Sequence, residues 1–93
     1  MSCYLVGYEL KKTQDLAKLN EQMQLWGGIR LRPTLWLVEV AGTAKTVRDA
    51  FHAAVSKDDG VFVLQLKPGM EWSSWDIPIA ASDWLTKNFP KPF

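Results

Sequence analysis

Glu9 is the residue of this 93-residue chain whose position most invites chemistry. It is the only charge in the apolar run Cys3–Leu10, at the end of that run. If a twofold axis brings two copies of Glu9 together, the paired carboxylates can bind Mg²⁺ or Mn²⁺, with water completing the coordination shell. Such an ion can assist phosphodiester hydrolysis. The simpler interpretation is a solvated strand end, and the sequence leaves both interpretations open.

Basic residues lie near Glu9 in the expected sheet. Lys11 and Lys12 follow the first apolar run, and Arg30 and Arg32 alternate with two apolar residues. Successive side chains of a strand point to opposite faces, so both guanidinium groups are expected on one face. These four residues could contact nucleic-acid phosphates without reading base sequence. Because the net charge is only +1, polyanions would be drawn to this patch rather than to the whole molecule. Alternatively, the charges protect an exposed sheet edge from aggregation.

The remaining reactive side chains predict structural roles. Cys3 is the only cysteine, which excludes an intramolecular disulfide and a multi-cysteine metal site. We expect it to be a small buried side chain. His52, the only histidine, is expected at the surface or at the boundary of the core. The sequence contains no phosphate-binding loop and no nucleophile-elbow motif.

Three of the five tryptophans lie in the last quarter of the chain: Trp72, Trp75 and Trp84. Trp26 and Trp36 fall within apolar patterns and are predicted to be structural. Tryptophan is enriched at interfaces that combine an apolar centre with a polar rim. Basic residues are not interleaved with the three later rings, so a subunit or protein contact is favoured over base stacking. We therefore predict an interface at Trp72, Trp75 and Trp84.

The elements that must position these residues alternate between strand and helix patterns. The expected strands are Cys3–Leu10, Ile29–Val40, Val61–Lys67 and Met70–Trp75. The expected helices run from Thr13 to Trp26, from Thr43 to about Ser56, and from Ser82 to Phe89. Pro33 interrupts the second strand, which indicates an edge or a bulge because proline donates no ladder hydrogen bond. Pro68-Gly69 predicts a hairpin that joins the last two strands.

This order predicts an α+β protein with the ferredoxin-like βαββαβ arrangement, in which two helices cover one face of a four-stranded antiparallel sheet. Residues 1–93 are expected to form a single domain, with 76–93 as a C-terminal extension that contacts a partner. Three of the strands are apolar on both alternating faces, so the helix-free face also needs a cover. The candidates are a second subunit, which we favour, and the C-terminal segment folding back.

The opening sequence MSCYLVGYEL resembles the first strand of the small CRISPR adaptation protein superfamily, the dimeric partners of the spacer integrase. Within it, the SinR-like and virulence-associated protein D-like branch is the most similar. Tyr8-Glu9-Leu10 stands where that superfamily has tyrosine, aspartate and an aliphatic residue, and Thr34–Val38 resembles its later strand. The resemblance covers residues 3–67. It implies a ferredoxin-like homodimer, in some members a metal-dependent nuclease with Glu9 at the acidic metal position.

Two departures from that superfamily weigh against nuclease activity. Glu9 replaces the aspartate, and the first helix lacks the usual arginine-rich run. We therefore predict a homodimeric binding or adaptor protein, associated with nucleic acid and linked to phage defence or mobile elements. The alternatives are a divalent-metal nuclease and a protein-binding inhibitor or toxin-like factor. No apolar stretch reaches the ~20 residues that span a bilayer, and no secretion signal is visible, so we expect a cytoplasmic protein with no membrane partner.

Overall fold

The computed structural model describes residues 1–9, 16–53, 55 and 59–90. Its elements alternate as the ferredoxin-like arrangement requires, followed by one additional helix. In order they are β1 (Ser2–Glu9), α1 (Leu16–Leu25), β2 (Ile29–Arg32), β3 (Leu35–Val40), α2 (Ala44–His52), β4 (Gly60–Leu66) and α3 (Ile79–Asn88). The strands form one four-stranded antiparallel sheet in the order β2-β3-β1-β4. The predicted α+β, ferredoxin-like class is confirmed.

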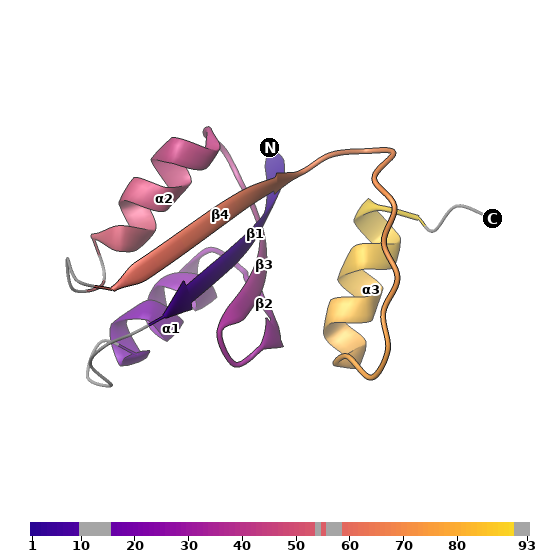
Figure 1. Ribbon diagram of the computed structural model, residues 1–93, viewed down its shortest axis with the longest axis horizontal. Helices are drawn as coiled ribbons and strands as arrows, with labels where there is room; N and C mark the ends of the chain where they lie inside the picture. Colours follow the sequence, from indigo (N-terminus) through magenta and orange to yellow (C-terminus); the bar gives the residue numbers. More distant parts are fainter. Residues whose placement is uncertain (10–15, 54, 56–58, 91–93) are drawn as a thin grey trace.

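The sheet lies between two helical layers (Figure 1). The helices α1 and α2 cover one face, called here the first face, and α3 packs against the opposite or second face. The segment 67–78 leaves the end of β4 and runs along α3 to reach the start of that helix (Figure 1). None of the helices in the described part of the chain is long and apolar enough to cross a membrane.

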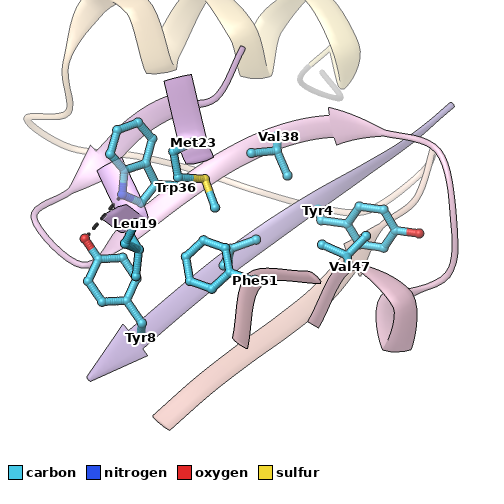
Figure 2. Close-up of a cluster of buried hydrophobic side chains, with 9 residues drawn as sticks. Tyr4, Tyr8, Leu19, Met23, Trp36, Val38, Val47 and Phe51 are labelled. Atoms are coloured by element: carbon cyan, nitrogen blue, oxygen red, sulfur yellow. Dashed lines mark hydrogen bonds between the residues drawn. The ribbon is translucent and has the colours of Figure 1, made fainter. Parts of the chain in front are cut away.

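The first-face core is aromatic and closely packed (Figure 2). Alternation along β1 directs Tyr4 and Tyr8 to this face, where both are buried. The Tyr8 hydroxyl donates to the Pro33 carbonyl at 2.8 Å and accepts from Trp36 Nε1 at 3.4 Å, while the Tyr4 hydroxyl donates to the Gly42 carbonyl. These bonds satisfy polar groups whose burial would otherwise be costly. The other buried members are Val6, Leu19, Met23, Val38, Val47 and Phe51.

The second face is covered only in part, and by the C-terminal segment. Leu37 packs with Ala81 and Leu85 of α3, and Trp72 Nε1 donates to the Phe89 carbonyl at 2.6 Å. The chain thus supplies a cover that we had expected chiefly from a second subunit. On β4, however, Phe62 remains 61% exposed and Leu64 48% exposed.

The long second strand is in fact two strands. Pro33 and Thr34 form the turn between β2 and β3, so the proline marks a hairpin and not an interruption within one strand. A turn suits proline, whose nitrogen has no hydrogen to donate to a ladder. The predicted edge position is correct for β2 only, since β3 lies inside the sheet.

The predicted strand Met70–Trp75 is wrong. The chain does turn at Pro68-Gly69, where Gly69 has a φ of 87°, but residues 70–78 form no strand and pair with no neighbour in the ladder. The alternation of Met70 and Trp72 instead directs apolar side chains against the second face, where both line one groove.

The helix ends differ modestly from their prediction. Thr43 does cap α2: its Oγ1 accepts from the Thr46 amide at 3.2 Å, and Thr46 Oγ1 accepts from the Thr43 amide at 2.8 Å. This reciprocal pair satisfies amides that lack a partner within the helix. The last helix begins at Ile79 rather than Ser82. The predicted cap Thr13, and Ser56 at the expected end of α2, lie outside the described residues.

The packing of α3 predicts the effect of truncating Leu85, which is 7% exposed. Leu85→Ala should lower the free energy of unfolding by about 2–3 kcal/mol, because it removes buried methyl groups and leaves a cavity. Urea denaturation measures the change, and Thr86→Ala is the control because Thr86 is exposed on the same helix. Equal stability of both variants would contradict the packing of α3 on the sheet.

Candidate functional site

The second face contains an apolar groove of about 540 Å³ between the sheet and residues 70–77. One side of the groove is the sheet, with leucines from β1, β3 and β4. The other side is formed mainly by side chains of the segment that precedes α3. The apolar lining residues are Leu5, Leu31, Leu35, Leu37, Leu64, Leu66, Met70, Trp72, Trp75, Ile77 and Leu85. The polar ones are Arg32, Glu71, Ser73 and Ser74. Grooves of this size and character accept apolar ligands or side chains.

The three tryptophans of the predicted interface have different environments. Trp72 is half-buried and hydrogen-bonds to the Phe89 carbonyl, while Trp84 is half-buried with its ring 6.2 Å from that of Phe89. Both belong to the cluster that fixes α3 on the sheet. Trp75 is 91% exposed at the margin of the groove. Of these three tryptophans, only Trp75 has a largely exposed ring.

The prediction that Arg30 and Arg32 share one face is wrong. Arg30 pairs with Trp36, its guanidinium lies 4.8 Å from the centre of that indole, and it donates to Asn20 of α1 at 3.0 Å. Arg32 instead pairs with Leu35, because the register shifts between the two arginines. One extra residue in the bulge reverses the direction of the next side chain. Arg30 therefore lies on the first face and Arg32 at the groove of the second.

The predicted cationic patch is consequently divided. Arg32 Nη2 donates to the Asp76 carbonyl at 2.9 Å, which attaches the end of β2 to the segment before α3. Lys11 and Lys12 lie outside the described residues. The guanidinium groups of the two arginines therefore do not form one continuous patch on a single face of the sheet. They do lie on the edge strand β2, as the edge-protection interpretation expects.

Glu9 is exposed at the end of β1, opposite Gly60 of β4. Gly7 pairs with Phe62, whose side chain lies on the second face. Because Glu9 is two residues after Gly7 on the same strand, its side chain also points to the second face. It borders a shallow hollow that Phe62 also lines. Among the described residues, no three acidic, histidine or cysteine side chains are grouped so that they could hold a metal ion.

The polar cluster on α2 lies away from the groove. Arg48 Nη2 is 2.7 Å from Asp49 Oδ1, and this hydrogen bond lowers the pKa of the Asp49 carboxyl below its usual value. Arg48 and Asp49 line a second hollow together with His52 and Asp59. The cluster thus combines an exposed ion pair with a histidine and a buried carboxyl group.

Cys3 is a buried thiol, as predicted. Desolvation by burial raises its pKa above the usual value, and the nearby Glu39 carboxylate raises it further. The thiol points toward Glu39 Oε2 at 3.9 Å. A thiol with a raised pKa is a poor nucleophile at neutral pH, because little thiolate is present.

Sequence reasoning did not identify the exposed pair Phe62 and Leu64 as a site. The signal was nevertheless present, since β4 is apolar on both alternating faces and the second face was expected to need a cover. What the sequence did not reveal was where α3 would lie. Only the position of α3 shows that the β4 side of the second face is the part left open.

Comparison with known proteins supports the fold. No family model matches the chain. The chain is similar in structure to a hypothetical protein from Thermus thermophilus, with a TM-score of 0.67 at 14% sequence identity. The alignment covers 84% of this chain and 95% of the other. At this identity the similarity extends to the fold alone.

The environment of Cys3 predicts slow alkylation by iodoacetamide at neutral pH, much slower than in the urea-unfolded chain. Because the pKa is raised, the rate should keep increasing with pH above the ordinary range of a thiol. Glu39→Gln removes a negative charge, so it should lower the pKa of Cys3 and accelerate alkylation. Glu71→Gln is the control. A folded-state pKa at or below that of a free thiol would contradict the described burial.

Proposed function

We propose that this protein is a homodimeric binding module whose subunits associate through the second face of the sheet. The observation that carries the proposal is the exposure of Phe62 and Leu64, 61% and 48%, beside an apolar groove. A contiguous apolar surface of this kind on a small protein is typical of an interaction site. A second copy is the simplest partner, because it is always present and carries the same surface.

Binding is favoured over catalysis by the side chains available. Glu9 is a single exposed carboxylate, Cys3 is buried with a raised pKa, and the Asp49 carboxylate is neutralised by Arg48. The resemblance to CRISPR adaptation proteins supports an adaptor role in the cytoplasm, in phage defence or with mobile elements. The separation of Arg30 and Arg32 favours a protein contact over nucleic acid as the primary interaction.

The proposal predicts a dimer by light scattering at micromolar concentration. Phe62→Glu should increase the dissociation constant at least about tenfold, because a charge would be buried in the apolar contact. Leu25→Glu is the matched control: Leu25 is also an exposed large apolar residue, 75% exposed, but it lies on α1. A monomeric wild type, or equal effects of the two substitutions, would contradict association through the second face.

A divalent-metal nuclease is the second candidate, and one observation favours it. Glu9 lies on the same face as Phe62, near the surface through which the subunits are proposed to meet. A twofold axis near this end of β1 would bring two Glu9 carboxylates together, where Mg²⁺ or Mn²⁺ could bind between them. Such an ion would activate water and stabilise charge on the phosphate.

The nuclease hypothesis predicts cleavage of RNA or DNA that depends on Mg²⁺ or Mn²⁺ and is lost in Glu9→Gln, which keeps the shape of the side chain and removes the charge. The assay uses purified wild type, with and without a chelator, and Glu21→Gln, an exposed position on α1, as the control for a general loss of negative charge. Activity that survives in Glu9→Gln would exclude the paired-carboxylate site. If the wild type shows no metal-dependent cleavage, the nuclease hypothesis is excluded and the proposed binding function is unaffected.

A further inference from the structure

Trp75 combines an exposed side chain with a backbone that is anchored by a neighbouring hydrogen bond. Its side chain is 91% exposed, although it stands at the margin of an apolar groove on its own subunit. The backbone beside it is anchored, because the Asp76 carbonyl accepts a hydrogen bond from Arg32 at 2.9 Å. Asp76 itself has a φ of 55°, the left-handed conformation that turns the chain at this point. The indole is thus carried on a fixed turn, which reduces the entropy lost when it binds.

We propose that Trp75 of each subunit inserts into the groove of its partner, so that two identical contacts hold the dimer. The inference rests on the proposed function, since it requires a homodimer. A projecting ring and an apolar groove lie next to each other on one face of the same subunit. In a twofold interface each surface patch meets its own copy, so an adjacent projection and groove can fit reciprocally.

The charges at the groove support a second copy as the occupant. Arg32 and Glu71 both line it, one cationic and one anionic. Within the described part of the chain, the only ion pair is that of Arg48 with Asp49, so neither groove charge is neutralised there by a partner. Across a twofold axis, Arg32 of one subunit can face Glu71 of the other in both directions. An uncharged apolar ligand would leave both charges unpaired at the rim.

The area required by a stable dimer indicates which residues must join Trp75. A buried tryptophan contributes roughly 150–250 Å², so two of them supply roughly 300–500 Å². A stable interface buries about 1,600 Å² in total. The remainder must come from the groove walls and from Phe62 and Leu64, which continue the same face along β4. Trp75 therefore acts as the anchor of a larger apolar contact, as aromatic hot spots do.

The test uses two complementary variants of the full chain. Trp75→Ala removes the projecting ring and leaves the leucines on the sheet side of the groove intact, whereas Leu64→Arg keeps the ring and obstructs the groove. Each variant alone should weaken dimerisation at least about tenfold. In an equimolar mixture, one Trp75 can enter one intact groove, so the heterodimer should be at least about tenfold tighter than either variant homodimer. Sedimentation with one variant fluorescently labelled measures all three dissociation constants.

Controls separate this inference from the proposed function. Ile79→Ala removes an apolar residue that is 80% exposed but does not line the groove, and it should leave the dimer unchanged. A wild-type dimer insensitive to Trp75→Ala would overturn the insertion of Trp75 and leave the homodimer standing. Two weakened variants that do not complement each other would overturn the groove as the binding place. A wild-type monomer that needs Trp75 to bind a different protein would overturn both proposals.

Discussion

The β-sheet of this protein carries apolar side chains on both faces, and both faces must therefore be kept from water. The helices α1 and α2 meet this requirement on the first face, where Tyr4, Val6 and Phe51 are fully buried. The second face has only α3 and the segment that precedes it. The position of the groove, the exposure of β4 and the attachment of Arg32 to Asp76 all follow from this unequal cover.

Simple dimensions explain why one helix is insufficient. Neighbouring strands lie about 4.8 Å apart, and a helix with its side chains is about 10 Å wide, so one helix covers about two strands. The sheet has four strands, and α3 packs toward the β2 and β3 side. Residues 70–77 extend the cover but do not close it, which leaves the groove above Leu5 and Leu64. The open part of the second face is therefore a geometrical consequence of the single helix.

The sequence predicted those features that depend on short-range patterns. Strand alternation indicated that both sheet faces are apolar, and the Thr43 cap placed the start of α2 correctly. The predictions from sequence were wrong where the structure depends on contacts between residues far apart in the chain. The alternation of Met70 and Trp72 is compatible with a strand as well as with an extended loop. These residues form a loop because their side chains pack against the apolar second face. The direction of Arg32 depends on a register shift against β3, which no pattern within Ile29–Arg32 reveals.

The alternation of side chains along β1 and β4 places the proposed dimer contact and the proposed metal site on the same face of the sheet. Glu9, Phe62 and Leu64 share the second face because β1 and β4 pair in register there. A metal bound by two Glu9 carboxylates would thus depend on the proposed association, in which Phe62 becomes buried. Arg30 lies on the opposite face, where it contacts Asn20 and Trp36, and so lies outside the proposed dimer contact. In the proposed arrangement, hydrolysis by a metal between paired Glu9 carboxylates requires the dimer, whereas the proposed binding through the second face requires no catalytic group.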